Sequence, residues 1–272
     1  MSLKAMYNQI ASNYATADRF GSISKSHALA IEQIEAAHLG KRPDYKVLDF
    51  GVGNGSFLDK LRHYMPDATF TGIDISKEML TYARKKLPLT TIEASATQAS
   101  TYLPHNSQDL VLAHFINAYI PIHTLFKQAD LLTRANGHFS LITTTYESFP
   151  LAQAQLAHFI AEGTLVGSVV GHYYKAMTKN TTVASGLSEL IQAFDAHEFN
   201  IVSHQRLEIP ITLQNIDELA LFGIEGTWFL NSISIRMLPK NFLVERLKRL
   251  FSKIFTFPYN DTHIIDIILA KK

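Results

Sequence analysis

Val47-Leu48-Asp49-Phe50-Gly51-Val52-Gly53-Asn54-Gly55 is the stretch that decides the fold of this chain: an apolar strand end and an acid are followed by three alternating glycines. Glycine has no Cβ, so it adopts left-handed backbone conformations and lets a ligand approach the main chain closely. Residues 56–61 then have the spacing of a helix start, whose free N–H groups bind polar ligand groups. In doubly wound α/β folds, such a loop binds a nucleotide-like cofactor.

The spacing of these glycines argues against two other phosphate-binding loops. The dinucleotide fingerprint G-x-G-x-x-G has its third glycine three positions after the second, where this chain has Ser56. A Walker loop needs Gly-Lys followed by Ser or Thr, and Lys60 lies too far into the expected helix to hold phosphates. The loop is therefore a poor fit to a pyrophosphate and excludes a Walker-type site.

A second feature is the acid that ends the next expected strand. Asp74 follows the apolar stretch 69–73 about twenty residues after the glycines, the distance at which such folds place a carboxylate that binds ribose. Ser76, just before a helical pattern, is well placed to cap that helix. This leaves Asp74 to hold both ribose hydroxyls.

Composition sets further limits. The chain has 272 residues, of which 47% are hydrophobic and 18% charged, so it can bury a full core. A net charge of +1 with interspersed signs lacks the electrostatic footprint of a protein that binds nucleic acid. The lack of cysteine excludes disulfides, thiolate zinc sites and cysteine nucleophiles. Neither a signal-peptide core nor an apolar run of membrane-spanning length is present, so we expect a cytoplasmic protein that is not integral to a membrane.

Strand and helix patterns alternate along the chain, which predicts an α/β fold with a doubly wound, seven-stranded, mostly parallel sheet. Helical spacing is expected over 57–65, 77–87 and 187–194, and a helical stripe from 122 to 132 is expected to stop at Asn136-Gly137. The seven expected strands are 46–50, 69–75, 90–94, 109–115, 138–145, 199–208 and 263–270.

The pattern Val-Leu-Asp-x-Gly-x-Gly-x-Gly resembles motif I of the class I, Rossmann-like S-adenosylmethionine (SAM)-dependent methyltransferases, and specific motifs carry the resemblance from Tyr45 to Thr145. The resemblance implies a loop for the methionine end of SAM and a last strand inserted antiparallel beside the fifth. It also implies SN2 transfer of the methyl group to a small-molecule acceptor, with S-adenosylhomocysteine as the second product.

The resemblance also implies a set of residues that bind the cofactor. Ser95 stands where the family commonly has an acid for the adenine amino group, and a serine is a weaker acceptor than a carboxylate. Glu93 takes that role if the register is shifted by two. The expected cofactor-binding residues are Tyr14, Asp49, Gly51, Val52, Gly53, Gly55, Asp74, Ile75, Met79, Ser95, Ala96, His114 and Phe115.

His114 follows the fourth expected strand, where the family faces the acceptor, and it is the candidate catalytic residue. An alternative interpretation is a histidine whose hydrogen bonds are satisfied at a strand end. A hydroxyl or carbon acid would need a base, for which His123 and His172 are further candidates, whereas a carboxylate acceptor would need none. No His or carboxylate cluster has the spacing of a metal site, so no metal is expected.

The acceptor pocket is expected to involve aromatic residues and one further histidine. Tyr7 and Tyr14 fit the aromatic cap near the N-terminus of many small-molecule methyltransferases, and Trp228 lies in a glycine-flanked run, typical of a mobile pocket wall. Core packing of one of the two tyrosines is the alternative for the cap, and packing of the insertion on the sheet is the alternative for Trp228. A largely apolar acceptor is expected. The candidate substrate residues are Tyr7, Tyr119, Tyr146, His172 and Trp228.

We expect a single methyltransferase domain over 1–272, with a helical cap at 1–42 and a SAM-binding core at 43–145. Two segments, 146–186 and 211–260, exceed ordinary loop lengths and are expected to form a lid over the substrate, before the last strand at 261–272. Residues 240–255 have the pattern of a basic amphipathic helix. Its basic face fits an acidic carrier protein, an anionic lipid surface, or a solvated face packed on its own domain.

Two other functions remain open at the level of sequence. An NAD-type oxidoreductase is disfavoured by the glycine spacing, and a SAM-binding regulatory protein without turnover is compatible with Ser95. The first differs from a methyltransferase in the cofactor that it binds, and the second in having no methyl transfer.

Overall fold

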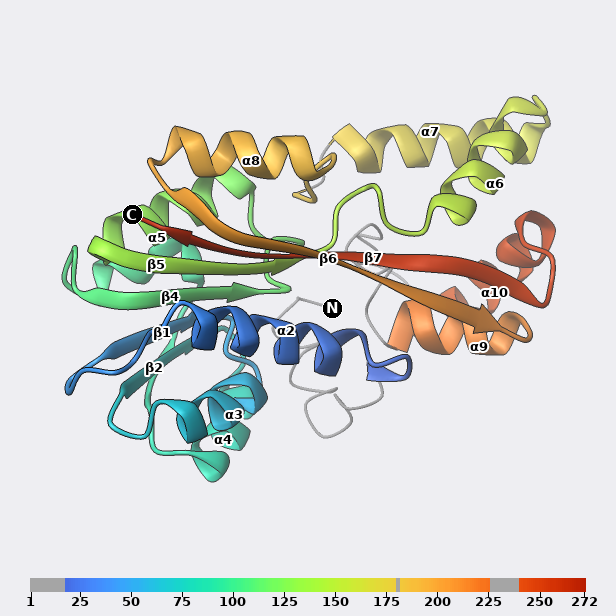
Figure 1. Cartoon of the computed structure of the whole chain (residues 1–272). Coiled ribbons are helices and arrows are strands. Elements are labelled where there is room, and N and C mark those ends of the chain that lie inside the picture. The colour runs from blue at the N-terminus through green and yellow to red at the C-terminus, as the bar shows by residue number, and fades with distance from the viewer. Residues whose placement is uncertain (1–17, 180–181, 226–239) are drawn as a thin grey trace.

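The computed structural model describes residues 18–179, 182–225 and 240–272, and the sheet with its flanking helices dominates it (Figure 1). The seven strands run in the order β3-β2-β1-β4-β5-β7-β6. Strands β1 to β5 pair in parallel, and β7 is antiparallel to both β5 and β6. The predicted fold class is confirmed. The strands are β1 (Lys46–Phe50), β2 (Thr69–Asp74), β3 (Thr90–Glu93), β4 (Gln108–His114), β5 (Thr133–Thr143), β6 (Asn200–Leu213) and β7 (Tyr259–Lys271).

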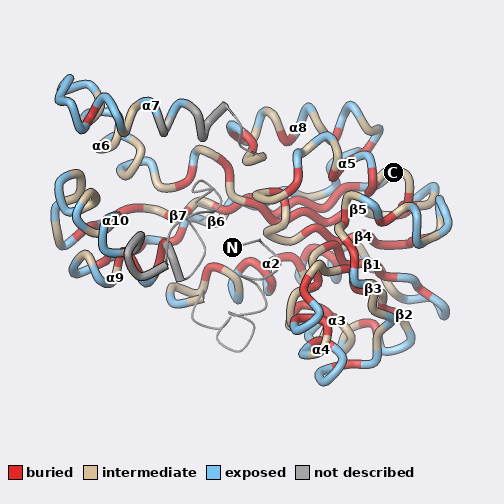
Figure 2. Tube along the Cα trace, turned by 180° about the vertical axis from the view of Figure 1, so that it is seen from behind, coloured by how far each residue is buried: buried red, intermediate tan, exposed pale blue. Residues whose placement is uncertain are grey.

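Helices cover both faces of the sheet, and Figure 2 shows the buried residues concentrated between them. One face packs against α2 (Ser22–Ala36), α3 (Ser56–Tyr64) and α4 (Lys77–Lys86). The other packs against the 3-10 helix η2 (Ala96–Thr101), α5 (Ile122–Leu132) and α8 (Leu187–Ala196). An edge-to-face pair of Phe126 and Phe194, with centroids 4.8 Å apart, joins α5 to α8 on that face. The expected cap at 1–42 contains α2, and residues 1–17 lie outside the described ranges.

The boundary between α5 and β5 differs from the prediction. The helix ends at Leu132 and the strand begins at Thr133, so Asn136-Gly137 lies within β5 instead of ending the helix. The cause is pairing with distant residues, which sequence spacing does not reveal. Thr133 pairs with Gln108 of β4, the Asn136 N–H donates to the Lys272 carbonyl, and the Lys272 N–H donates to the Gly137 carbonyl.

The hairpin of β6 and β7 is longer than predicted. It stays paired to Leu213 and Tyr259, so residues 211–213 and 259–260 of the expected insertion are strand. Between them lie α9 (Ile216–Ala220), a π-helical turn (Leu221–Glu225) and α10 (Lys240–Ile254), while 226–239 are outside the description. The other insertion contains α6 (Pro150–Ala161) and α7 (Leu165–Lys179).

A small third core occupies the far end of this hairpin. Ile211, Leu213 and Tyr259 pack there with Leu219 of α9, and Phe251 of α10 packs against them. In Figure 1, α6, α9 and α10 gather at this end, to the right of the sheet. The prediction that these segments form a lid stays a prediction.

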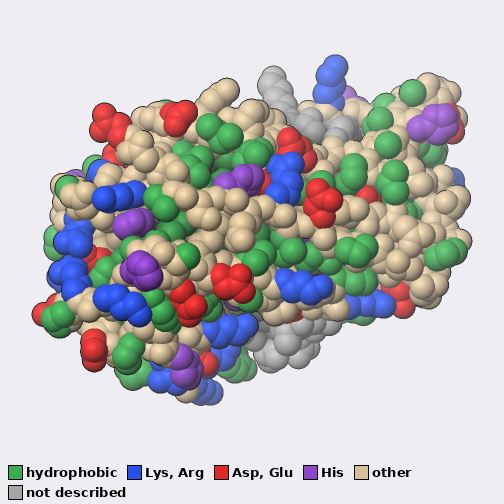
Figure 3. Space-filling model, in the orientation of Figure 1, with side chains coloured by type: hydrophobic (Ala, Val, Ile, Leu, Met, Phe, Trp, Pro, Cys, Tyr) green, Lys and Arg blue, Asp and Glu red, His purple; other side chains and the backbone are tan. Residues whose placement is uncertain are grey.

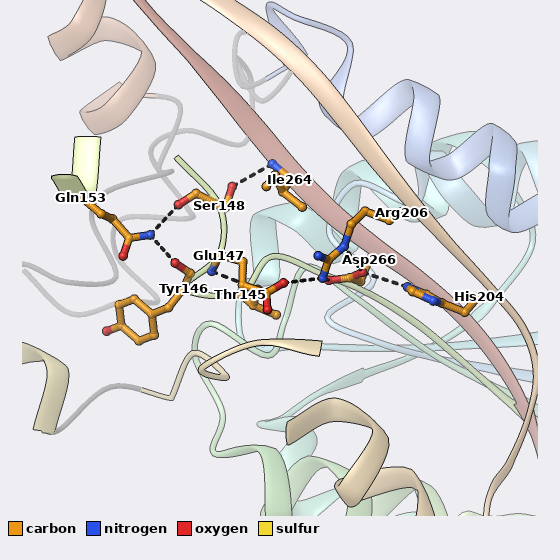
Figure 4. Close-up of polar contacts among 9 residues, drawn as sticks. All are labelled: Thr145, Tyr146, Glu147, Ser148, Gln153, His204, Arg206, Ile264 and Asp266. Atoms are coloured by element: carbon orange, nitrogen blue, oxygen red, sulfur yellow. Dashed lines mark hydrogen bonds and ion pairs between the residues drawn. The ribbon is translucent and has the colours of Figure 1, made fainter. Parts of the chain in front are cut away.

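A polar network joins the segment after β5 to the hairpin (Figure 4). Arg206 of β6 donates from Nε and Nη2 to the two carboxylate oxygens of Asp266 on β7, each at 2.9 Å. The guanidinium also pairs with Glu147, and His204 Nε2 lies 2.8 Å from Asp266 Oδ1. Because the Asp266 side chain is almost fully buried, these partners offset the cost of removing its carboxylate from water.

The same segment is held by backbone contacts. The Ser148 hydroxyl accepts the Ile264 N–H at 2.9 Å, and the Gln153 side chain donates to the carbonyls of Tyr146 and Ser148. The chain leaving β5 is therefore fixed to β7 before α6 begins.

Replacing Asp266 with Asn should lower the free energy of unfolding by about 1.5–3 kcal/mol, because hydrogen bonds to a charged group are lost in a buried place. Urea unfolding measures the change. The Glu147→Gln variant is the control, since this partner is half exposed and its pair should contribute less than about 1 kcal/mol. Equal losses in the two variants would contradict the central place of Asp266.

Candidate functional site

A cleft lies at the carboxyl ends of β1, β2 and β4, where the strand order reverses between β1 and β4. This is the position at which open α/β sheets bind ligands. The empty space in and at the mouth of the cleft is about 720 Å³. Its lining residues are Gly51, Gly53, Ile73, Asp74, Ile75, Met79, Ala94, Ser95, Ala96, His114, Phe115, Ile116, Tyr119 and Ile120.

The glycines of the loop after β1 have different roles. Gly53, with φ of +53°, has no atom nearer than 3.9 Å to the place where a Cβ would stand, so its main chain is open to a ligand. Gly55, with φ of +75°, packs against α4, and a Cβ there would stand 3.0 Å from Ala83 Cα. The first of these glycines lines the cleft, and the second sets the spacing of α3 and α4.

Asp74 joins the loop to the end of β2. Its Oδ2 accepts the Gly53 N–H at 2.9 Å, and its Oδ1 accepts the Ser76 N–H at 2.8 Å. Burial raises the pKa of Asp74, while hydrogen bonds from backbone N–H groups act in the opposite direction. An ionised carboxylate has about four lone-pair positions, so acceptor capacity remains for a ligand. Ser76 caps α4 by accepting the Met79 N–H, as its position in the sequence predicts.

Three of the expected cofactor residues lie behind the loop instead of in the cleft lining. Asp49 is buried within β1, where burial and the nearby Asp74 raise its pKa well above the ordinary value. Val52 packs against Gly72 of β2, and Gly55 packs against α4. Their positions fit support of the loop, because alternate residues of a strand or tight turn face away from its open side.

Ser95 and Ala96 form part of one wall with Met79 and Ile75. The Ser95 hydroxyl accepts the Thr97 N–H at 3.3 Å and lies 2.9 Å from the Thr97 hydroxyl, so it also caps η2. Glu93, the alternative for the adenine amino group, is exposed at the end of β3 and does not line the cleft.

His114 lies at the end of β4 and lines the cleft. Its Nε2 is 3.0 Å from the Ser140 hydroxyl, and its Nδ1 is buried with no hydrogen-bond partner among the described residues. The Phe57 ring packs edge-on against it, with centroids 4.3 Å apart. Burial, and then His27, lower the pKa of His114 well below the ordinary value. The imidazole is therefore neutral near neutral pH.

His27 of α2 completes an aromatic group beside His114. Its ring centroid lies 5.9 Å from that of His114 and 5.0 Å from that of Phe57. Burial, with a smaller effect of Lys60, lowers the pKa of His27 to about 3. Two neutral imidazoles thus stand where a pair of protonated ones would repel each other.

The expected substrate residues divide into three groups. Tyr119 lines the cleft. Tyr146 is fixed through its main chain, whose N–H donates to the Ala184 carbonyl, and it is not part of the lining, while His172 is exposed on α7. Tyr7, Tyr14 and Trp228 lie outside the described residues.

Four lining residues are absent from the sequence prediction. Ile73 and Ala94 immediately precede the predicted Asp74 and Ser95, so a wider window at each strand end would include them. Ile116 and Ile120 flank Tyr119 on the loop after β4, and nothing in their spacing distinguishes them from core residues. Within the ranges that the structure describes, no group of three metal-binding side chains occurs.

Comparison with known proteins agrees with this geometry. A family profile described as a methyltransferase domain matches residues 47–137. The chain is 35% identical over 85 residues to a trans-aconitate 2-methyltransferase of Afipia carboxidovorans, covering 30% of this chain and 32% of that protein. It is 26% identical over 221 residues to a malonyl-[acyl-carrier protein] O-methyltransferase of Bacillus cytotoxicus, covering 79% and 63%. The matches thus span about a third to two thirds of these relatives' length.

Solved structures share the fold. The YcgJ protein of Bacillus subtilis superposes with a TM-score of 0.57 at 15% identity, covering 92% of this chain and 98% of that one. Geranyl diphosphate C-methyltransferase of Streptomyces coelicolor, solved with S-adenosylhomocysteine, gives 0.52 at 12% identity, covering 90% and 77%. Residues 47–137, which include the glycine loop and Asp74, thus match a methyltransferase domain, and the chain shares the fold of these solved structures.

Proposed function

We propose that this protein is a SAM-dependent methyltransferase that acts on a small, largely apolar molecule. The observation that carries the proposal is the pairing of an open glycine main chain at Gly53 with the Asp74 carboxylate at the switch point of the sheet. Neither the NAD-type oxidoreductase nor the regulatory protein without turnover receives support from the relatives, which are named as methyltransferases.

The lining residues fit the cofactor in chemistry. Asp74 has remaining acceptor capacity for ribose hydroxyls, and the wall of Ile75, Met79, Ala94 and Ala96 is apolar, as a base such as adenine requires. When bound, SAM supplies an already activated methyl group. The protein then has to align the acceptor and exclude water.

The acceptor side of the cleft supports the proposed apolar substrate. Ile116, Tyr119 and Ile120 line it, and the described lining contains neither lysine nor arginine. The relatives named for trans-aconitate and for malonyl-[acyl-carrier protein] act on acidic molecules. An acidic acceptor would meet no cation from the described lining residues here, which favours an uncharged one.

We assign to His114 the role of base for an acceptor that must lose a proton. With the proton on Nε2 donated to Ser140, the buried Nδ1 keeps a lone pair that no described residue uses. The other two candidates, His123 and His172, are exposed and lie outside the described lining. A cytoplasmic location stays a prediction from the sequence.

Calorimetric titration with SAM, S-adenosylhomocysteine and NAD tests the cofactor. The first two should bind and NAD should not. Transfer of labelled methyl to a panel of apolar hydroxyl and carbon acids then separates an enzyme from a protein that only binds SAM. Binding of NAD alone, or SAM binding without transfer to any member of the panel, would contradict the proposal.

Replacing Asp74 with Asn should weaken SAM binding by about 10- to 100-fold, because a charge-assisted hydrogen bond contributes about 1.5–3 kcal/mol. The same titration measures it. Asp44→Asn, at an exposed residue outside the lining, is the matched control and should leave the affinity unchanged. An unchanged affinity in the Asp74 variant would remove the proposed ribose contact.

Gly53→Ala and Gly55→Ala should separate ligand binding from packing. Both glycines have positive φ, so each substitution adds backbone strain of about 1–2 kcal/mol. Only at Gly55 does the new methyl also collide with α4, so urea unfolding should show the larger loss there. For a given loss of stability, Gly53→Ala should lose more SAM affinity than Gly55→Ala does. The reverse order would contradict the assignment of the two positions.

His114→Gln should lower kcat by about 100-fold or more if the acceptor loses a proton to this residue, with a smaller change in KM for SAM. Burial keeps the imidazole neutral. Lowering the pH from about 8 to about 6 should therefore not reduce the wild-type rate with the inflection of an ordinary histidine. His123→Gln serves as the control. An unchanged kcat would contradict the base role and indicate an acceptor that needs no base.

A further inference from the structure

The α6–α7 hairpin exposes an apolar surface that no described residue covers. From Pro150 to Gly171 the chain has one carboxylate, Glu162, and neither lysine nor arginine. None of the residues of α6 is buried. At the start of α7, Leu165 is 83% exposed and Val169 51% exposed. In Figure 3, green hydrophobic side chains lie among tan atoms over this part of the molecule, at the upper right, together with a histidine and an acidic side chain. Contiguous exposed apolar surface marks an interaction site.

Two glycines explain why Leu165 and Val169 of α7 lie on its exposed side. A Cβ at Gly167 would stand 2.7 Å from the Phe159 carbonyl oxygen, and one at Gly171 would stand 2.8 Å from Ile160. Helix α7 therefore meets α6 through a Gly-x-x-x-Gly face, a mode of close packing that does not depend on burying large apolar side chains. Leu165 and Val169, one turn apart, remain outside this contact.

The base of the hairpin is firmly attached. The buried Asp261 carboxylate of β7 accepts the N–H groups of Leu151 and Ala152 at 3.1 and 2.8 Å, which caps α6. The Phe149 N–H donates to the Thr262 carbonyl at 2.9 Å. The apolar surface is thus presented by an anchored element.

A cationic face lies beside it. Helix α10 contacts α6, and Phe251 of α10 and Phe255, the residue after its end, pack against the core at the end of the hairpin. Arg249 and Lys253, four residues apart and hence on one face of the helix, are exposed. Lys248 is paired with Asp217 and Glu245 and does not add to this charge.

We propose that the α6–α7 hairpin and the outer face of α10 form a docking surface for an anionic lipid bilayer. An apolar surface beside cations is the combination that binds at an anionic interface, where the apolar groups enter the headgroup region and the cations remain among the phosphates. Among the described residues, no helix has the length and apolarity needed to span a membrane, so the contact is with its surface.

An acidic carrier protein or a second copy of the chain would explain only one of the two features, the exposed apolar side chains or the exposed cations. An acidic carrier protein would match Arg249 and Lys253 but leave Leu165 and Val169 exposed. In a two-fold dimer the same surface meets itself, so the cations of both copies would come to one interface. The lipid surface satisfies both features. If the methyltransferase proposal holds, such docking suits an acceptor that dissolves in a bilayer.

Co-sedimentation with vesicles tests the docking without requiring methyl transfer. We expect the protein to pellet at low salt with equal parts of phosphatidylglycerol and phosphatidylcholine, and not with phosphatidylcholine alone. Arg249→Glu/Lys253→Glu should weaken binding at least about fivefold per cation, an effect that salt reduces. Leu165→Ser/Val169→Ser should weaken it with little dependence on salt. Lack of pelleting at low salt overturns the proposal.

Matched variants complete the test. Lys85→Glu/Lys127→Glu changes charge equally at exposed lysines of α4 and α5, and Ile201→Ser/Val202→Ser removes exposed apolar side chains of β6; both should pellet as the wild type does. Equal losses in the controls would overturn the assignment. So would a dimer that only Leu165→Ser/Val169→Ser dissociates, or binding of an acidic carrier protein in place of vesicles. Titration of every variant with SAM keeps a failure of docking distinct from a failure of the proposed function.

Discussion

The hydrogen bond from the Gly53 N–H to the Asp74 carboxylate is the constraint on which the cleft depends. β1 and β2 are neighbours with Phe50 opposite Ile73, so the loop after one strand and the acid after the other meet at one edge of the sheet. The N–H groups of Gly51 and Val52 also donate to the Ile73 carbonyl, at 2.8 and 3.0 Å. Three successive donors therefore fix the loop to β2. A side chain at Gly53 would project from this fixed turn into the space that a ligand needs.

Burial shifts the pKa values of the carboxyls and of the histidines around the cleft in opposite directions. Burial raises the pKa values of Asp74 and Asp49 and lowers those of His114 and His27. As pH falls below the ordinary histidine value, the unfolded chain takes up protons that the folded histidines refuse, which reduces stability. The two carboxyls take up protons more readily when folded, which increases stability as pH falls. The two effects oppose each other, and near neutral pH the histidines add no positive charge to the cleft.

The sequence predicts the part of the cleft formed by the glycine loop and Asp74 much better than the part formed by the loop after β4. The glycines, Asp74 and Ser76 are recognisable because each position requires a particular property, such as an open main chain, a carboxylate at a strand end or a helix cap. Ile116 and Ile120 line the cleft only because the loop after β4 turns back toward Gly51, whose missing side chain makes room for Ile116. Any apolar residue would produce the same pattern there, so the sequence does not distinguish pocket from core.

The largest differences between predicted and observed boundaries come from strand pairing with β4, with β7 and with Lys272. Hydrogen bonds with Lys272 hold Asn136-Gly137 within β5, and pairing with Tyr259 extends β6 to Leu213. Such contacts join residues far apart in the chain, so local propensity carries no signal of them.

Strand β7 also unites the two segments that exceed ordinary loop lengths. Asp266 of β7 binds Arg206, which in turn pairs with Glu147. Asp261 of β7 caps α6. Tyr259, the first residue of β7, packs with α10 in the core at the end of the hairpin. Segments that leave the sheet at different points of the sequence are thus attached to one strand, on the side of the sheet away from the glycine loop. The glycine loop is fixed by β2 and these segments by β7, so the loop and its carboxylate depend on contacts that the two long segments do not make.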